Sequence, residues 1–250
     1  GKIGTDAHGA FFLDSLARLG IGTHFAQSAT PTAQVACLIT PDGERTMRTF
    51  LGSVPEMTGA DVAQGLFEGT RLALIEGYTL PNDRLTHQSM LYARDAGTKI
   101  AFSLASFEIV EAFKDVIHSL IEEHVSIVFA NEAEAHALHG LSPRYCCQEL
   151  SRHCEIAVVS EGAQGCYVAW EGQVAHCPAL PVKAVDCTGA GDLFAAGFLH
   201  GWLQGLDPET CGRIGCILGA AIVQVPGAIL PEEQWPRIRE ELGVVGLMGH

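Results

Sequence analysis

The chain has 250 residues, enough for one α/β domain with a sizeable core. Its hydrophobic fraction of 48% excludes a disordered chain, and its net charge of −14 excludes a nucleic-acid backbone or an anionic membrane surface as partner. Nine cysteines without a CxxC spacing, and no apolar run long enough to cross a bilayer, favour reduced thiols in the cytoplasm.

The first fifty residues predict a helix followed by a β-hairpin. Residues 9–20 carry apolar side chains at helical spacing and end at a glycine, a residue that commonly follows a helix. Two strand-like runs within 33–50 flank the turn sequence Pro41-Asp42-Gly43. Arg45 and Arg48 lie on the second run, where they either reach a substrate or phosphate or form a solvated strand face.

Beyond residue 58 strand-like and helix-like segments alternate. The predicted strands are 71–75, 99–104, 125–130, 156–160 and 166–169, and the predicted helices are 82–96, 107–122, 132–139, 145–153, 189–204, 208–224 and 231–242. Such alternation implies a parallel sheet covered by helices on both faces. We therefore expect one α/β domain over residues 1–250, with the hairpin 33–50 forming a small lid outside the alternating pattern.

The most informative stretch is residues 182–201. An apolar, strand-like run ends at Asp186, the turn Gly189-Ala190-Gly191 follows, and a helix begins with Asp192 in its first turn. Glycine amides and a helix N-terminus together attract an anion, and a carboxylate beside them can orient a hydroxyl for phosphoryl transfer. The alternative is an ordinary strand–turn–helix corner with an acid that stabilises the helix start, and the motif alone favours neither reading.

A second candidate site follows the predicted strand 125–130. Asn131 and Glu134 lie at the carboxyl end of a parallel strand, where ligands bind in open α/β sheets. Glu134 can hold a magnesium-bound water there, because Mg²⁺ keeps several waters and takes few carboxylates. The same spacing also fits a helix capping box, and the two interpretations are compatible.

Two glycine-containing segments extend the list of candidates. Ser160, Gly162 and Gly165 follow a predicted strand and allow the backbone to approach a ligand closely, although a simple β-turn explains the same spacing. Small residues over 219–228 leave room for a flat purine or only allow tight helix packing. The sequence contains no GxxxxGK[ST], which excludes a P-loop ATPase.

The order of these motifs resembles the ribokinase, or PfkB, family of sugar and nucleoside kinases over nearly the whole chain. The matching pieces, in order, are Gly4-Thr5-Asp6-x-x-Gly9, the hairpin, Asn131-x-x-Glu134, Ser160-x-Gly162-x-x-Gly165 and Asp186-x-Thr188-Gly189-Ala190-Gly191-Asp192. The hairpin text ITPDGERTM and the following LGS look closest to adenosine kinase-like members.

This resemblance implies a three-layer α/β/α ribokinase-like domain, with a mostly parallel central sheet and a small β lid. It also implies an ATP-dependent kinase that transfers the γ-phosphate to a primary hydroxyl of a sugar or ribonucleoside. Asp192 would be the catalytic base, and the amides of Gly189, Ala190 and Gly191 would form the anion hole.

The resemblance also implies which residues bind ATP and metal ions. Asn131 and Glu134 would hold Mg²⁺ through water, and Arg45 or Arg48 would reach the substrate from the lid. K⁺ is implied near the carbonyls around Asp186 and the 225–228 turn. The residues that would bind ATP are Ser160, Gly162, Gly165, Thr188 and Gly227.

Several departures from the family pattern keep a second function open. Nothing matches the N-terminal segment in which the family has a Gly-Gly pair and a hydroxyl-binding Asp, so we expect that part of the domain to be missing. Cys187 replaces a usual Thr, and Ser103 stands where many members have Asp. The alternative function is a catalytically idle kinase-fold module for assembly or regulation. Val35 and Leu38 on the hairpin are compatible with either a monomer or a lid-mediated homodimer.

Overall fold

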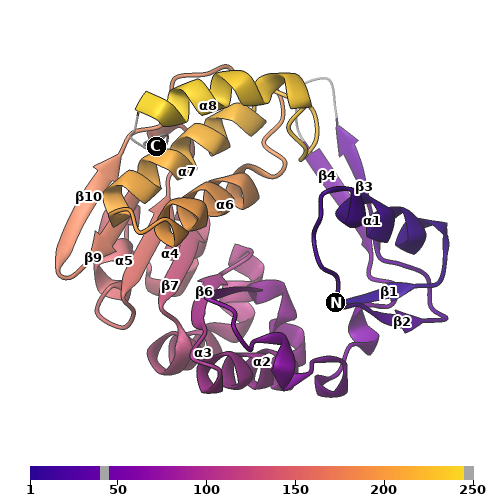
Figure 1. Cartoon of the computed structure of the whole chain (residues 1–250). Coiled ribbons are helices and arrows are strands. Elements are labelled where there is room, and N and C mark those ends of the chain that lie inside the picture. The colour runs from indigo at the N-terminus through magenta and orange to yellow at the C-terminus, as the bar shows by residue number, and fades with distance from the viewer. Residues whose placement is uncertain (40–44, 245–250) are drawn as a thin grey trace.

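The computed structural model describes residues 1–39 and 45–244. A six-stranded sheet with helices on both faces forms the larger part of the molecule, and an N-terminal part with two small sheets lies beside it (Figure 1). The predicted α/β class and mostly parallel sheet are confirmed. The predicted Pro41-Asp42-Gly43 turn lies outside the described residues.

The N-terminal part contains one helix and two separate pairs of strands. Strands β1 (Lys2–Gly4) and β2 (Ala26–Ser28) pair in parallel, and β3 (Gln34–Ile39) and β4 (Arg45–Phe50) pair antiparallel. Helix α1 (Ala7–Arg18) begins at Asp6, whose carboxylate accepts the N–H of Gly9 at 2.8 Å and that of Thr32 at 2.7 Å. This carboxylate therefore joins the start of α1 to the chain that leads into the hairpin.

The main sheet has the strand order β10-β9-β8-β7-β6-β5. Its parallel strands are β5 (Leu72–Glu76), β6 (Lys99–Ser103), β7 (Ile127–Asn131) and β8 (Ile156–Ser160). Strands β9 (Cys166–Trp170) and β10 (Gln173–Cys177) continue the sheet antiparallel. Strand β10 was not expected from the sequence. It follows β9 through a tight hairpin turn, in which Glu171 and Gly172 have positive φ, at 47° and 77°.

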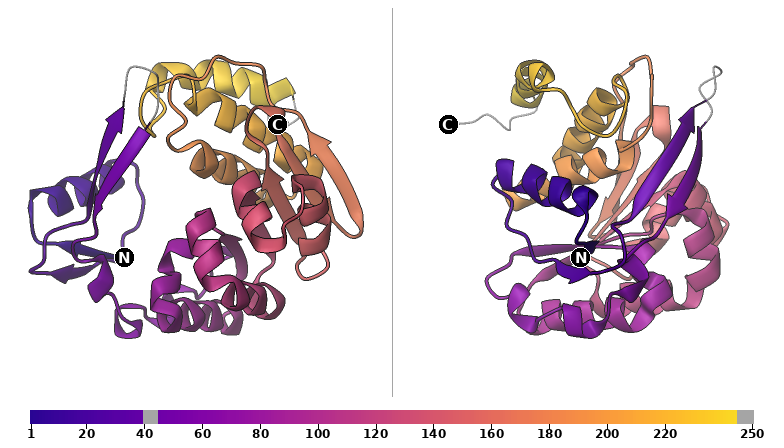
Figure 2. Two further views of the ribbon diagram at one scale, coloured as in Figure 1. Left: turned by 180° about the vertical axis from the view of Figure 1, so that it is seen from behind. Right: turned by 90° about the vertical axis from the view of Figure 1, so that its right-hand side faces the viewer.

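Helices cover both faces of this sheet (Figure 2). One face carries α2 (Asp83–Asp95), α3 (Phe107–His124), α4 (Glu132–His139) and α5 (Pro143–Leu150). The other carries α6 (Ala190–Leu203) and α7 (Pro208–Ile222), with α8 (Trp235–Val244) packed on α7. Short 3₁₀ turns lie at Val54–Glu56, Gly59–Asp61, Gln64–Leu66, Gly77–Asn82, Gly162–Gln164 and Glu232–Gln234. Among the described residues no helix is both long and apolar enough to span a bilayer.

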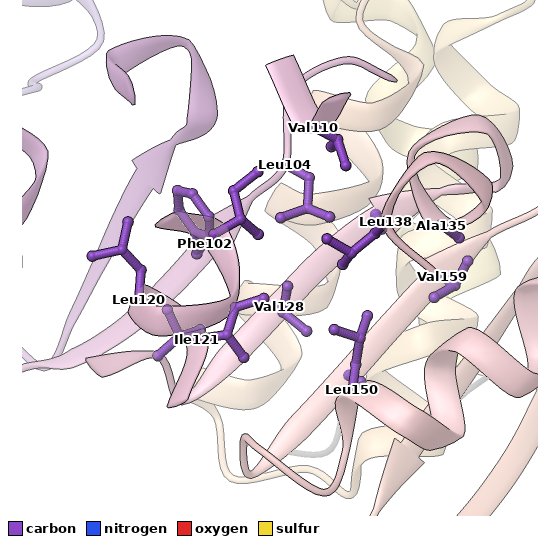
Figure 3. Packing of buried hydrophobic residues seen from close by; sticks show 14 of the residues in the cluster. Phe102, Leu104, Val110, Leu120, Ile121, Val128, Ala135, Leu138, Leu150 and Val159 are labelled. Carbon is purple, nitrogen blue, oxygen red and sulfur yellow. The ribbon is translucent and has the colours of Figure 1, made fainter. Parts of the chain in front are cut away.

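The core follows from strands that are apolar on both faces. Phe102, Val128 and Val159 point into a cluster with α3, α4 and α5, which Figure 3 shows from close by. Their neighbours along the strands, including Phe129 and Val158, point into a second cluster under α6 and α7. Because both faces are covered, the interiors of the four parallel strands β5 to β8 hold only apolar side chains, and their polar residues lie at the strand ends.

The strand expected just before Asp186 is not present in the structure. The run that ends at Asp186 is not a strand, and residues 178–188 form no regular element. Val185 is 61% exposed, and the N–H groups of Val185 and Asp186 donate to the carbonyl of Val223, at 2.7 and 3.2 Å. The segment is held by the C-terminal end of α7 rather than by a neighbouring strand, which its apolar residues alone did not reveal.

Candidate active site

The four parallel strands all end on polar residues at the same edge of the sheet. β5 ends at Glu76, β6 at Ser103, β7 at Asn131 and β8 at Ser160. Glu76 is directly opposite Ser103, and Asn131 is directly opposite Ser160. The carboxyl edge of a parallel sheet is where α/β proteins bind ligands, so these side chains mark the expected crevice.

Asn131 and Glu134 form a capping box at the start of α4. The amide oxygen of Asn131 accepts the N–H of Glu134 at 2.9 Å. The Glu134 carboxylate accepts the Asn131 backbone N–H at 3.0 Å and its side-chain Nδ2 at 2.6 Å. Glu134 is only 4% exposed. The capping interpretation of this pair is therefore confirmed, and the box fixes the Glu134 carboxylate in place.

Burial leaves the Glu134 carboxylate without enough compensation for a full charge. Its pKa is raised to about 7, chiefly by burial and also by the nearby carboxylate of Glu76, against the hydrogen bond from Asn131 that lowers it. A cation brought to this edge would favour the charged form.

The donor set fits a magnesium ion held through water. Among the described residues no three His, Cys, Asp or Glu side chains gather closely enough to ligate a metal directly. Magnesium commonly binds through one or two carboxylates, several waters and substrate phosphates, so a single fixed carboxylate is sufficient.

The corner at the start of α6 requires glycine for two independent reasons. Gly189 precedes the helix with φ 77° and ψ 4°, a left-handed conformation that other residues rarely adopt. A Cβ atom there would also lie 2.9 Å from the Cβ of Ala228. Gly191 and Asp192 follow in the first turn, both exposed, where backbone N–H groups have no partner within the helix. The Ala190 N–H donates to the carbonyl of Cys187 at 3.2 Å, so the corner offers a ligand the Gly189 and Gly191 N–H groups and the Asp192 carboxylate more directly than the Ala190 N–H.

Asp186 ties this corner to the turn after α7. Its Oδ1 accepts the N–H of Thr188 at 2.9 Å and the Thr188 hydroxyl at 2.7 Å. Its Oδ2 accepts the N–H of Gly227 at 2.9 Å. Thr188 and Gly227 are far apart in sequence, and a single carboxylate that is only 9% exposed brings them together.

The α6 corner and the strand edge interact electrostatically through their carboxylates. The pKa of Glu76 is raised by burial and then by the charge of Asp192, and Glu76 in turn raises the pKa of Glu134. Glu76 was not among the predicted site residues. Its sequence signal is nevertheless the same as that of Asn131, because each polar residue ends an apolar run.

Four other predicted residues either lie on a separate sheet or make contacts that support the fold. Arg48 is exposed on β4, in the separate two-stranded sheet, and Arg45 begins the same strand. The Ser160 hydroxyl donates back to the carbonyl of Ala130 at 3.5 Å. Packing requires a glycine at position 165, because a Cβ atom there would lie 2.0 Å from the carbonyl oxygen of Cys177.

Comparison with known proteins agrees with this geometry. The model of the pfkB family carbohydrate kinases matches residues 1–235, so the chain belongs to that family. Adenosine kinase 1 of Arabidopsis thaliana is 27% identical over 255 residues, which cover 93% of this chain and 74% of that protein. Ribokinase of Mus musculus is 26% identical over 241 residues, which cover 90% of this chain and 72% of that protein.

Solved structures of the same kind superpose closely on this chain. The crystal structure of adenosine kinase from Sinorhizobium meliloti gives a TM-score of 0.88 at 28% identity, covering 96% of this chain and 76% of that one. A probable sugar kinase from Rhizobium etli gives a TM-score of 0.88 at 28% identity, covering 98% and 76%. The resemblance to the ribokinase family stated from the motifs is thereby confirmed.

Proposed function

We propose that this protein is an ATP-dependent kinase that transfers the γ-phosphate of ATP to a primary hydroxyl of a sugar or ribonucleoside. One observation carries the proposal. Asp192 lies exposed in the first turn of α6, which begins after the left-handed Gly189, and its charge acts on Glu76 at the polar edge of the parallel sheet. A base and an anion-binding corner at one point are what phosphoryl transfer to an alcohol requires.

In this mechanism Asp192 accepts the proton of the attacking hydroxyl as its oxygen bonds to the γ-phosphorus. The bond from phosphorus to the oxygen of ADP breaks in line with the attack. The N–H groups of Gly189, Ala190 and Gly191 stabilise the charge on the oxygens of the transferred phosphoryl group. Positioned base catalysis of this type contributes roughly 10²–10⁴-fold.

Asn131 and Glu134 would hold Mg²⁺ through water, and the ion supplies positive charge that offsets the phosphate oxygens. The proposed ATP contacts are the loop with Ser160, Gly162 and Gly165, and the Thr188–Gly227 pair that Asp186 joins. K⁺ near Asp186 remains a prediction, which replacement of K⁺ by Li⁺ in the assay tests.

For the substrate we propose a ribonucleoside ahead of a free sugar. The support is the adenosine kinase-like hairpin sequence and the similarity to adenosine kinases. The hairpin β3–β4 would act as a lid over the acceptor, with Arg45 or Arg48 toward it. A lid would exclude the water that otherwise hydrolyses ATP.

The test measures ADP release with adenosine, ribose and fructose, for the wild-type protein and for Asp192→Asn. Asp192→Asn is expected to lose at least about 10²-fold in kcat while its affinity for ATP, measured by titration, changes little. Near-normal turnover in this variant would refute the assignment of the base. Absence of ADP release with every acceptor, in wild-type protein that binds ATP, would favour the catalytically idle module.

A further inference from the structure

A group of buried thiols lies where α7 packs on the antiparallel end of the sheet. Cys166 begins β9, Cys177 ends β10, and Cys211 and Cys216 lie on α7. None of them is more than 6% exposed. The Sγ atoms of Cys166 and Cys216 are 3.9 Å apart, and the Cys177 thiol donates to the carbonyl of Glu209 at 3.4 Å. The proposed kinase mechanism uses none of these thiols.

Cys166 and Cys177 have the backbone geometry of a cross-strand disulfide. They are directly opposite each other in the antiparallel β9–β10 pair, and a Cβ atom on Gly212 of α7 would lie 2.8 Å from the Cys177 Sγ and 3.4 Å from the Cys166 Sγ. Opposed residues in such a pair have Cα atoms about 4.5–5.5 Å apart, within the roughly 4.4–6.8 Å range of disulfides. Both side chains point to the α7 side of the sheet, so no strand has to turn over for an S–S bond to form.

The two thiols are not equivalent. The pKa of Cys177 is lowered, first of all by the neighbouring Cys166 thiol, whereas the pKa of Cys166 is raised by its thiol neighbours and by burial. The direction of these two shifts favours Cys177 over Cys166 as the thiol that ionises. The thiolate is the form that attacks a disulfide.

The position of Cys177 gives an oxidant a route to it. β10 is five residues long and is the edge strand of the sheet, and Cys177 is its last residue before the irregular segment 178–188. Edge strands open locally at far lower cost than central ones. Opening of this one end exposes the thiol without unfolding the core.

The same position also links the thiols to the loop after β8. A Cβ on Gly165 would lie 2.0 Å from the Cys177 carbonyl oxygen and 2.6 Å from the backbone N of Ala179, so the two backbones are in direct contact. Gly165 immediately precedes Cys166. Whatever fixes Cys166 to Cys177 therefore also fixes the end of the 161–165 loop.

We infer that Cys166 and Cys177 are a redox modification site that a glutathione-type disulfide converts to a reversible intrachain disulfide, which holds β10 and the 161–165 loop closed. The Cys177 thiolate attacks glutathione disulfide, forms a mixed disulfide and releases one glutathione, which takes up the Cys177 proton. The Cys166 sulfur then attacks Cys177 Sγ and releases the second glutathione, which takes up the Cys166 proton. Two protein thiols are oxidised and one glutathione disulfide is reduced.

The test incubates the full chain in glutathione redox buffer, blocks free thiols and maps disulfides by mass spectrometry after proteolysis. The expected product links the peptides of Cys166 and Cys177, and reduction by excess glutathione reverses it. Cys146 and Cys147 serve as the matched control, because they are equally buried and adjacent on α5. A link from Cys166 to Cys216, or full alkylation of both Cys166 and Cys177 after oxidation, would overturn the inference.

Hydrogen exchange tests the structural consequence in the same samples. The amides of β10 and of residues 161–165 are expected to exchange roughly tenfold or more slowly in the oxidised protein, because the new bond closes a short loop. The Cys216→Ser variant should behave like wild type, and Cys177→Ser should lose both the link and the slowing. Unchanged exchange in protein that carries the link would show that the bond does not hold the loop. The readout needs no catalysis, so it is independent of the proposed kinase activity.

Discussion

Replacement of Glu134 by Gln tests how this protein holds a buried acid at its site. In the folded protein the pKa of Glu134 is about 7, against 4.5 for an ordinary glutamate, chiefly because the carboxyl is buried. Because folding raises the pKa of this acid, the free energy of unfolding is highest below about pH 4.5, where the carboxyl is protonated in both the folded and the unfolded chain. The protein loses stability as the pH rises from about 4.5 to about 7, since the folded protein then has to bury a charge that the unfolded chain exposes to water.

The size of the effect follows from the difference between the two pKa values. About 2.5 pH units correspond to about 3 kcal/mol of unfolding free energy lost between pH 4.5 and pH 8. The Gln variant carries no charge and avoids this loss. It also loses one of the two hydrogen bonds from Asn131, because the new NH₂ group faces the Asn131 Nδ2, at a cost of about 1 kcal/mol. The variant is therefore expected to be about as stable as wild type near pH 5, where the loss in wild type already offsets the missing hydrogen bond, and about 2 kcal/mol more stable at pH 8.

Urea unfolding at several pH values between 5 and 8, without ATP or Mg²⁺, measures this change with pH. The difference between variant and wild type cancels the titration of all other groups. Glu132→Gln is the matched control, because it makes the same substitution at an exposed position in the same first turn of α4. A Glu134→Gln difference that follows pH no more steeply than this control would refute the reasoning, since burial of Glu134 would then carry little cost.

Three further predictions concern other parts of the site and the core. Gly189→Ala is expected to destabilise the protein by about 1–2 kcal/mol in urea unfolding, because a side chain at this positive φ is strained. A change in the free energy of unfolding smaller than the error of the measurement would contradict this. Asp186→Ala, which removes three hydrogen-bond acceptor contacts, is expected to weaken ATP binding about tenfold or more in a titration, and unaltered affinity would show that the 188–227 link is not needed. His118 and His139 stack edge-to-face, and burial lowers the pKa of each, so stability that is complete above pH 6.5 is lost as the pH falls below it. His139→Leu should flatten that acid slope in pH-dependent unfolding, and an unchanged slope would assign it to other groups.

The sequence predicted best those parts of the site in which a few neighbouring residues complete the geometry. Asn131 and Glu134 are three residues apart, and their hydrogen bonds follow from the start of one helix. The corner from Gly189 to Asp192 is equally local. Local geometry of this kind depends on backbone conformation and helix ends, which residue types specify directly.

Features that depend on which distant segments meet were not predicted. The link from Asp186 to Gly227 spans 41 residues and requires α6 and α7 to pack side by side. Glu76 belongs to the site only because β5 lies two strands from β7. The error at residues 182–186 has the same origin, because the sequence of this run does not show that its backbone bonds to the end of α7 rather than to a neighbouring strand.

The carboxylates at the carboxyl edge of the parallel sheet explain together why a site with a buried acid would bind a phosphate that carries a cation. Burial raises the pKa of both Glu76 and Glu134, and the charge of Asp192 raises the pKa of Glu76 further, as Glu76 does that of Glu134. A free nucleotide triphosphate would meet like charge here, whereas its complex with a divalent cation would relieve the repulsion and favour the ionised Glu134. Under the proposed function, the same burial that destabilises the protein without ligand at neutral pH makes the edge selective for a cation-bound phosphate. The capping box holds the carboxylate in position for that step, so the structural and the functional reading of Asn131 and Glu134 are two consequences of one geometry.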